Sequence, residues 1–223
     1  MVKSSLSAAE AFSAFGKERL IAIIRAHTPD DAFWAASQAL EAGFRLVEMT
    51  WTTPDVLTVI TRLCQAYPQA VIGAGTVLTT IQAQQSIEAG AAFLVSPILD
   101  EDVVRFGVDH DRLTLPGVLT PTEMYHASQW GAPAVKLFPA ASVGGPMFIQ
   151  AIKGPFPTAQ IVATGGLTLE DIEPYLQAGC LAIGVGSPLM SETMIRSRDE
   201  TTVREQCRMY LAQRDATLAL ETA

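Results

Sequence analysis

The 223-residue sequence predicts an α/β protein, a (β/α)8 TIM barrel with an extra helix before the first strand. Three observations predict this fold. Short apolar runs rich in β-branched residues recur at intervals of roughly 20 to 26 residues, the spacing of βα units. The segments between them carry helix-capping signals. No linker or change of composition divides the chain, so a single domain over residues 1–223 is predicted. An open doubly wound sheet is the alternative architecture.

Eight apolar runs are the predicted strands, and each is about as long as a buried parallel strand. Helices fill the intervals, one helix precedes the first strand, and a closing helix is expected over about residues 197–214. In chain order the predicted strands are Leu20–Ile24, Leu46–Thr50, Val71–Ala74, Phe93–Ser96, Leu113–Pro116, Ala134–Phe138, Gln160–Thr164 and Leu181–Val185.

Three of the predicted helices begin with a Thr-Pro pair. Thr28, Thr53 and Thr120 each place a capping hydroxyl before a proline at the first helical position. Glu123 follows Thr120 at the spacing of a capping box. We therefore expect three helices to start at these pairs.

Four of the predicted helices end in glycine, which readily adopts the left-handed conformation of a C′ residue. These glycines precede alternate strands, whose inward side chains share layers in a TIM barrel. The constant spacing therefore predicts that Glu48 and Lys136 face the barrel axis in one layer near its upper end. The glycines are Gly43, Gly90, Gly131 and Gly179, and the residues five positions later are Glu48, Val95, Lys136 and Gly184.

The composition argues against several classes of partner. A formal net charge of −8 leaves no basic surface for a nucleic acid. No apolar run is long enough to span a membrane, and the opening MVKSSLSAAEAFSAFG lacks the apolar region of a signal peptide, so the cytoplasm is predicted. The 3 cysteines show no CxxC spacing, and the 3 histidines show no metal-binding spacing and are expected on the surface. No metal site is predicted.

Lys136 and Glu48 are the candidate catalytic residues. Lys136 lies in the apolar stretch AVKLFPA, where an ammonium costs several kcal/mol unless it is paired or loses its proton. Glu48 ends the apolar run LVEMT. The two could form a structural ion pair. The interpretation we favour is a nucleophilic, Schiff-base lysine with a carboxylate proton shuttle, because TIM barrels keep catalysts at the C-terminal ends of their strands.

Glycines after the last two strands predict a phosphate site. Gly165 and Gly166 follow the seventh strand, and Gly186 and Ser187 follow the eighth. Glycine lets backbone N–H groups approach an anion, and these two loops are the usual phosphate cradle of TIM barrels. The substrate should therefore carry a phosphate.

Other candidates lie at the rim of the barrel. Arg25 follows the run LIAII and could bind a substrate carboxylate with its guanidinium fork, or serve as a structural rim arginine. Thr76 of GAGT offers a hydroxyl after the third strand, and Pro97 can shape the pocket wall after the fourth.

The motifs LVEMT, VIGAGTV, LVSP, LPGVLTPTE, VKLFPA, TGG and GVGS, in this order, resemble the 2-keto-3-deoxy-6-phosphogluconate (KDPG) aldolase family. The resemblance implies a class I aldolase, commonly homotrimeric, that cleaves 2-keto-3-deoxy-6-phospho sugar acids to pyruvate and glyceraldehyde 3-phosphate. Some members also cleave 4-hydroxy-2-oxoglutarate. It further implies that Lys136 forms the Schiff base, that Glu48 transfers protons, and that no metal or other cofactor is needed.

The same resemblance assigns substrate-binding residues. Thr76 and Pro97 would contact the pyruvate moiety. The other implied substrate-binding residues, most of them around the phosphate, are Thr164, Gly165, Gly166, Gly186 and Ser187.

Two positions depart from the gluconate-type pattern. Thr52 stands where those members have an arginine, and Ala141 stands where they have a glutamate. The opening AIIRAHTPDDA, with Arg25, is instead similar to the 2-keto-3-deoxy-6-phosphogalactonate branch. The sequence leaves the substrate open among the phosphogluconate, phosphogalactonate and hydroxy-oxoglutarate compounds.

Other functional classes fit parts of the pattern. A phosphate-binding isomerase or a ligand-binding barrel would use Lys136 and Glu48 only as an ion pair. A metal-dependent class II aldolase is a third alternative, which the scattered His and Cys residues disfavour.

Overall fold

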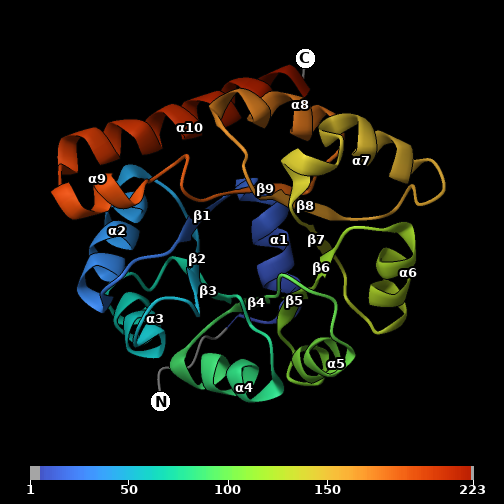
Figure 1. Cartoon of the computed structure of the whole chain (residues 1–223), viewed down its shortest axis with the longest axis horizontal. Helices are drawn as coiled ribbons and strands as arrows, with labels where there is room; N and C mark the ends of the chain where they lie inside the picture. The colour runs from blue at the N-terminus through green and yellow to red at the C-terminus, as the bar shows by residue number, and fades with distance from the viewer. Residues whose placement is uncertain (1–5, 222–223) are drawn as a thin grey trace.

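The computed structural model describes residues 6–221 and shows parallel strands in a nearly closed barrel surrounded by helices (Figure 1). The strand order is β5-β4-β3-β2-β1-β9-β8-β7-β6, and every neighbouring pair is parallel. This arrangement confirms the predicted TIM barrel, and the open doubly wound sheet is wrong. The first five residues, part of the stretch predicted to lack a signal peptide, lie outside the described residues.

The strands lie within a residue or two of their predicted positions, with one exception. Pro116 divides the predicted fifth strand into β5 and β6, because β5 pairs with β4 while β6 pairs with β7. This segment of the chain therefore connects the β4 side of the barrel to the β7 side. The strands are β1 Leu20–Ile24, β2 Leu46–Thr50, β3 Val71–Gly75, β4 Phe93–Val95, β5 Leu113–Leu115, β6 Gly117–Val118, β7 Val135–Leu137, β8 Ile161–Thr164 and β9 Ala182–Val185.

The helices form the outer ring, and the predicted helix before the first strand is present. The closing helix begins later and runs further than expected, and the short helix α9 before it was not predicted. The helices are α1 Ala8–Glu18, α2 Pro29–Ala42, α3 Val56–Ala66, α4 Thr80–Ala89, α5 Glu101–Asp109, α6 Pro121–Gln129, α7 Gly145–Lys153, α8 Ile172–Gln177, α9 Glu192–Ser197 and α10 Glu200–Glu221, with 3-10 turns at Ala140–Val143 and Leu169–Asp171.

Two of the three Thr-Pro predictions are confirmed. The Thr28 hydroxyl accepts a hydrogen bond from a backbone N–H of α2, and Thr120 forms a capping box with Glu123 at the start of α6. The third is wrong, since α3 begins only at Val56. The buried Thr53 hydroxyl instead accepts a hydrogen bond from the backbone N–H of Ala26 at 3.3 Å, which joins the loops after β2 and β1.

The predicted glycine stops are confirmed, because all four have positive φ. This conformation ends each helix and returns the chain to the next strand. The angles are 121° at Gly43, 108° at Gly90, 94° at Gly131 and 90° at Gly179.

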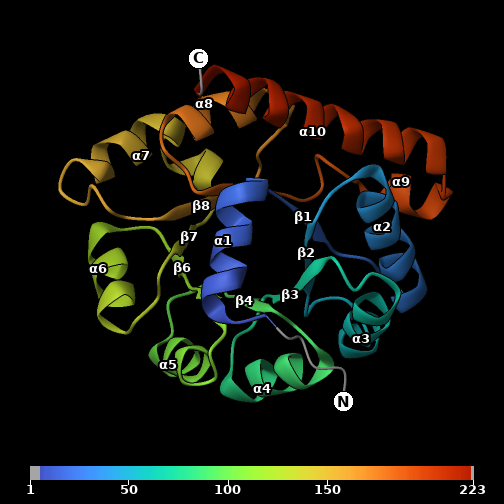
Figure 2. The ribbon, with the colours of Figure 1, turned by 180° about the vertical axis from the view of Figure 1, so that it is seen from behind.

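Apolar side chains fill the barrel from its N-terminal end. Helix α1 lies across that end (Figure 2) and inserts Ala11 and Phe15 into the interior cluster. The Phe15 ring packs edge-on against Phe93 of β4, with ring centroids 4.9 Å apart. Because α1 closes this end, a pocket in the barrel can open only at the opposite end. Of the described helices, none combines the length and apolarity needed to cross a membrane.

Candidate active site

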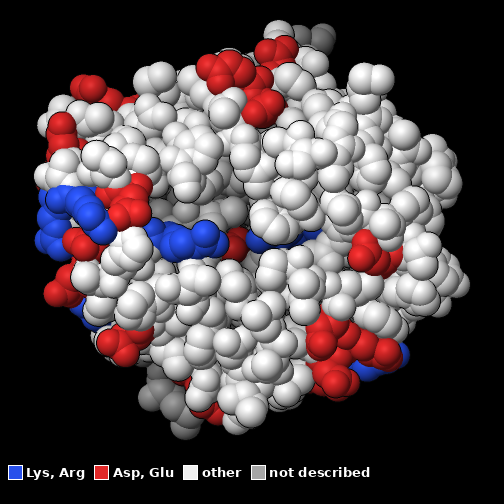
Figure 3. Space-filling view, in the orientation of Figure 1, with Lys and Arg blue, Asp and Glu red and all other residues white. Residues whose placement is uncertain are grey.

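A cavity of about 730 Å³ opens at the C-terminal end of the barrel. Figure 3 shows it as a hollow near the middle of this face, with both positive and negative side chains inside. The loops after seven of the strands contribute to its wall. Every residue predicted for the site lines this cavity: Arg25, Glu48, Thr76, Pro97, Lys136, Thr164, Gly165, Gly166, Gly186 and Ser187.

Lys136 and Glu48 face each other at the buried end of the cavity. Lys136 is 7% exposed and Glu48 is 2% exposed. The Lys136 Nζ lies 3.9 Å from the Glu48 Oε1, so the equal spacing in the sequence placed them correctly. This separation allows charge attraction but is longer than a hydrogen bond. The amine and the carboxylate are therefore close enough to exchange protons through a bound substrate or water.

Gly75 and Phe138 are the neighbours that shape the surroundings of Glu48 and Lys136. A Cβ on Gly75 would lie 2.0 Å from the Glu48 Oε1, so the glycine leaves the room that the carboxylate occupies. On the other side, the Lys136 Nζ lies 5.1 Å from the centroid of the Phe138 ring. The aromatic face attracts the cation and covers the amine.

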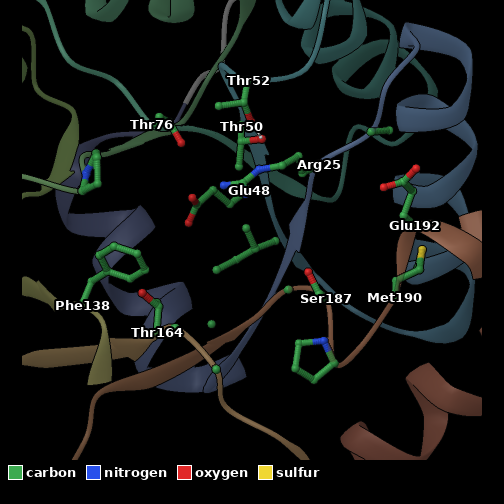
Figure 4. Close-up of a pocket in the computed structure, with 18 of the residues that line it drawn as sticks. Arg25, Glu48, Thr50, Thr52, Thr76, Phe138, Thr164, Ser187, Met190 and Glu192 are labelled. Carbon is green, nitrogen blue, oxygen red and sulfur yellow. Dashed lines mark hydrogen bonds between the residues drawn. The ribbon is translucent and has the colours of Figure 1, made fainter. Parts of the chain in front are cut away.

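Arg25 supplies hydrogen-bond donors at the side of the cavity. It is exposed, and it makes no hydrogen bond or ion pair within residues 6–221. Figure 4 shows its guanidinium extending into the pocket near Glu48 and Thr50. An arginine without a protein partner, directed into a pocket, is suited to bind a carboxylate.

Thr50 and Thr52 form a small hydroxyl chain next to Arg25. The Thr50 hydroxyl donates to the carbonyl of Ile24 at 3.2 Å and lies 2.9 Å from the Thr52 hydroxyl. Thr50 has only one hydroxyl proton, so Thr52 must be the donor between them. Thr52 therefore presents only acceptor lone pairs to a ligand.

The glycine loops come together at the upper end of the cavity. Gly165 and Gly166 have φ of 98° and 79°, and Gly186 and Ser187 line the same space from β9. A Cβ on Gly165 would lie 2.9 Å from the Phe138 ring, so a larger residue would not fit. The loop thus has the left-handed backbone that turns successive N–H groups toward an anion.

Several lining residues were missed by the sequence reasoning. His27, expected as an ordinary surface residue, lines the pocket rim, and its Nε2 lies 3.1 Å from the Glu192 Oε2. The hydrogen bond from His27, together with the nearby Arg196, lowers the pKa of Glu192 below its usual value. Period-two alternation from Lys136 could have identified Phe138, but Glu192 lies on the helix that was not predicted.

The other lining residues that were not predicted are mostly small or apolar. Ile23 of β1 lies two residues before Arg25, so strand periodicity could have found it. The rest are two strand residues that the same periodicity could have found, Thr50 two positions after Glu48 and Gly184 two positions before Gly186, and loop residues, for which periodicity gives no signal. These residues are Ala26, Thr50, Gly184, Pro188 and Met190, and Thr52 had been noted only as a departure from the gluconate-type pattern.

Among residues 6–221, no group of three or more His, Cys, Asp or Glu side chains is placed to hold a metal ion. The cysteines Cys64, Cys180 and Cys207 are free thiols, and burial raises the pKa of each. The titratable groups inside the cavity are therefore Lys136, Glu48 and the rim pair of His27 and Glu192.

Comparison with known proteins identifies similar chains. The family model described as KDPG and KHG aldolase matches residues 13–206. The 2-dehydro-3-deoxy-6-phosphogalactonate aldolase of Escherichia coli is 37% identical over 172 residues, 76% of this chain and 83% of that protein. The 2-dehydro-3-deoxy-phosphogluconate aldolase of Pseudomonas aeruginosa is 32% identical over 193 residues, 86% of this chain and 88% of that protein.

A solved structure is also similar. It is KDPG aldolase from Legionella pneumophila, with pyruvate captured at low pH as a covalent carbinolamine intermediate. Its TM-score to this chain is 0.83 at 29% identity, covering 88% of this chain and 96% of that one.

Proposed function

The chain belongs to the KDPG and KHG aldolase family and is a lyase, and we propose that it is a class I aldolase acting through a Schiff base on Lys136. Its substrate is a 2-keto-3-deoxy-6-phospho sugar acid, which it cleaves to pyruvate and glyceraldehyde 3-phosphate. The observation that carries the proposal is the Lys136 Nζ 3.9 Å from the Glu48 Oε1 at the buried end of the pocket. An amine and a proton acceptor are the two groups that this chemistry needs.

The first step is addition of the Lys136 amine to the C2 ketone of the substrate. Loss of water then gives an iminium, which withdraws electrons from the adjacent C3–C4 bond. The pocket supports this step because Lys136 is buried beneath Phe138 and beside one carboxylate. Glu48 is the carboxylate close enough to accept the lysine proton before the amine adds to C2.

Glu48 moves the proton in the second step. It takes the proton from the C4 hydroxyl, directly or through water, as the C3–C4 bond breaks and the aldehyde leaves. It then returns a proton to the enamine carbon, and hydrolysis of the iminium releases pyruvate and regenerates Lys136. Glu48 suits this role because its carboxylate is buried and held in the space above Gly75.

The ends of the substrate are held by separate groups. The phosphate binds the backbone N–H groups around Gly165, Gly166 and Ser187. The carboxylate binds near Arg25 and Thr76, since the net charge of −8 requires local donors to attract an anion. Thr52 can accept a hydrogen bond from a substrate hydroxyl.

The identity of the preferred sugar acid can be decided by experiment. The similar proteins include both phosphogalactonate and phosphogluconate aldolases. Thr52 and Arg25 fit the galactonate pattern better, since the gluconate-type arginine is missing. Pyruvate release from the phosphogalactonate, phosphogluconate and 4-hydroxy-2-oxoglutarate compounds, measured side by side with lactate dehydrogenase, would rank them.

Further parts of the proposal follow from the resemblance to the family and from the composition of the sequence. The barrel acts as a single domain without metal or other cofactor, in the cytoplasm, and as a homotrimer. Exhaustive chelation should therefore leave cleavage unchanged. A loss of cleavage that added zinc restores would favour a class II aldolase instead.

Borohydride reduction with pyruvate tests the covalent step. Reduction should add one pyruvate-derived group to the chain, and mass spectrometry should locate it on Lys136. The Lys136→Met variant, which keeps an unbranched side chain one atom shorter and has no amine, should give neither adduct nor cleavage. An unmodified chain that still binds a sugar phosphate would instead identify a non-covalent isomerase or ligand-binding barrel.

A further inference from the structure

The Thr164 hydroxyl has no hydrogen-bond partner although it is buried in the active-site pocket. Thr164 is the last residue of β8, is 2% exposed and lines the cavity. Among residues 6–221, its Oγ1 has neither a donor nor an acceptor within hydrogen-bond range. Buried hydroxyls are normally paired because an unpaired one is destabilising. An unpaired hydroxyl in a pocket therefore indicates contact with a ligand.

The packing of Thr164 fixes the direction of its hydroxyl. Thr164 lies in register with Gly184 of β9, and a Cβ on that glycine would be 2.7 Å from the Thr164 methyl. The methyl thus occupies the space over β9, which leaves the hydroxyl on the β7 side. Figure 4 shows the oxygen on the side of Phe138 and away from Ser187. The hydroxyl is therefore directed toward the strand of the lysine and away from the phosphate end.

The Glu48 carboxylate and the Lys136 amine lie closer to the mouth of the barrel than the backbones of these two residues, by about the length of two strand residues. Glu48 is in register with Gly73, yet its carboxylate fills the space above Gly75, two residues further along β3. The Lys136 Nζ lies 3.9 Å from that carboxylate. The amine and the carboxylate therefore meet about two residues, or roughly 6.6 Å, above the layer of their backbones.

Thr164 lies at this same height. Its strand neighbour Val162 is in register with Lys136, and Thr164 is two residues further along β8. Its hydroxyl therefore lies at the height of the amine, on the strand next to that of the lysine, while Glu48 approaches from β2.

We propose that Thr164 is a catalytic residue whose hydroxyl donates a hydrogen bond to the C2 oxygen of the bound keto acid. This inference rests on the proposed Schiff-base function. The hydrogen bond holds the oxygen while the Lys136 amine adds to C2, and it orients the carbinolamine hydroxyl until it leaves as water. The role differs from a phosphate contact because it acts at the reacting carbon.

The atoms and charges of this step balance. The lysine ammonium gives one proton to Glu48, the neutral amine forms the N–C2 bond, and an N–H proton passes to the C2 oxygen. The Glu48 carboxylic acid then protonates the resulting hydroxyl. The C2–O bond breaks, and the nitrogen lone pair forms the C=N bond. Ammonium and ketone become iminium and water, and Thr164 ends unchanged.

Oxygen exchange in pyruvate tests the proposal, because pyruvate has no phosphate and the exchange needs no carbon–carbon cleavage. Loss of ¹⁸O from the C2 position of labelled pyruvate would be followed by mass spectrometry, with the rate in Lys136→Met subtracted as background. Thr164→Val should slow the loss about tenfold to a hundredfold. Thr164→Ser, which keeps the hydroxyl, should recover most of the rate.

Melting temperatures show whether Thr164 acts only structurally. Thr164→Val should melt at or above the wild-type temperature, because valine removes an unpaired buried hydroxyl. The matched control is Thr217→Val in α10, a buried threonine whose hydroxyl donates to the Gln213 carbonyl. This control should leave the exchange unchanged.

Three results would decide against the proposal. Wild-type exchange in Thr164→Val would overturn it. So would a lower melting temperature in Thr164→Val combined with failure of Thr164→Ser to recover exchange, since that is the behaviour of a structural residue. If the wild-type chain itself gives neither exchange above background nor a borohydride adduct, the proposed Schiff-base function is wrong, and this inference falls with it.

Discussion

Single residues decide the chemistry of this barrel. Glu48 is the one carboxylate within ion-pair range of Lys136 among the described residues. Its burial and its place above Gly75 leave it little freedom to move. We therefore expect proton transfer to depend on this side chain far more than substrate binding does.

Replacing Glu48 by Gln should impair proton transfer both in cleavage and in exchange of the pyruvate methyl protons. Glutamine keeps the shape but cannot accept a proton, so cleavage should fall by roughly 10²- to 10⁴-fold. Exchange of the pyruvate methyl protons with deuterium, followed by NMR, should fall similarly. The control Glu88→Gln changes an exposed glutamate on α4 and should behave as wild type. Wild-type methyl exchange in Glu48→Gln would remove Glu48 from the mechanism.

The pair of His27 and Glu192 predicts a pH effect at the rim. The hydrogen bond lowers the pKa of Glu192 below its usual 4.5. A carboxyl with a lowered pKa favours folding above its unfolded pKa, and that contribution disappears as the pH falls through the lowered value. NMR titration of the Glu192 carboxyl should show its pKa rising in His27→Gln. The rise should be partial, because Arg196 still pairs with Glu192. An unchanged pKa would mean that the contact does not form in solution.

The residue contacts differ in how far the sequence could predict them. The sequence predicted that Glu48 and Lys136 face each other, because each lies five residues after a glycine that ends a helix. Equal spacing from the helix end gives equal positions along the strands, since backbone geometry sets the strand register. The chain from Thr52 through Thr50 and the pair of His27 and Glu192 could not be derived. Those contacts depend on loop conformations that leave no periodic signal in the sequence.

At the scale of elements, strand β3 has glycine at two inward positions, where side chains of the neighbouring strands need the space. Gly73 and Gly75 both face inward, where a Cβ would overlap Phe93 in one case and Glu48 in the other. Glycine normally weakens a strand, so its presence here indicates close approach of other side chains. Without a side chain at Gly75, the strand leaves the space that the Glu48 carboxylate occupies.

Gly75→Ala should displace Glu48 without unfolding the barrel. The added Cβ would lie 2.0 Å from the Oε1 and 2.6 Å from the Cδ, so the buried carboxylate must move. Cleavage should fall more than tenfold, while circular dichroism shows a folded protein. The matched control is Gly16→Ala in α1, where the nearest atom would be 3.6 Å away. It should be stabilised by about 0.5–1 kcal/mol with full activity. Full activity in Gly75→Ala would show that the carboxylate position is not critical.

Element boundaries were predicted best where the chain is long, apolar and capped. The helix starts at Thr28 and Thr120 were correct because a hydroxyl and a proline act locally. Thr53 carries the same signal, yet its hydroxyl accepts a hydrogen bond from Ala26 in the loop after the neighbouring strand, so a tertiary contact overrides the cap. Helix α9 has only 6 residues, too few for a helical period to be recognised.

At the scale of the whole molecule, the two halves of the catalytic face differ in charge. Figure 3 shows mostly uncharged surface above and to the right of the pocket, apart from an acidic group at the right and an acidic cluster with a basic group at the lower right. Exposed apolar side chains lie in the loops and helix starts after β3, β4, β6 and β7. They are Leu78, Ile81, Ile98, Leu119, Phe138 and Met147, and we call them the mouth patch.

The mouth patch predicts how the expected homotrimer can be weakened. Large exposed apolar patches commonly mark contacts between proteins. Ile81 and Met147 are 67% and 78% exposed, so Ile81→Glu with Met147→Glu should shift the protein toward monomers in analytical ultracentrifugation. The control Leu220→Glu changes a 64% exposed leucine on α10, outside the patch, and should not. A wild-type chain that sediments as a monomer would contradict the predicted trimer.

The closure of the barrel by α1 has a kinetic consequence. Phe15 and Phe93 block one end, so every molecule must enter and leave by the mouth. In the proposed reaction, the three-carbon fragment is held on Lys136 at the buried end of the pocket, and the phosphorylated aldehyde is nearer the mouth. Departure should therefore be ordered, with the aldehyde first and pyruvate last. Pyruvate should then inhibit competitively against the sugar acid, and glyceraldehyde 3-phosphate should inhibit noncompetitively.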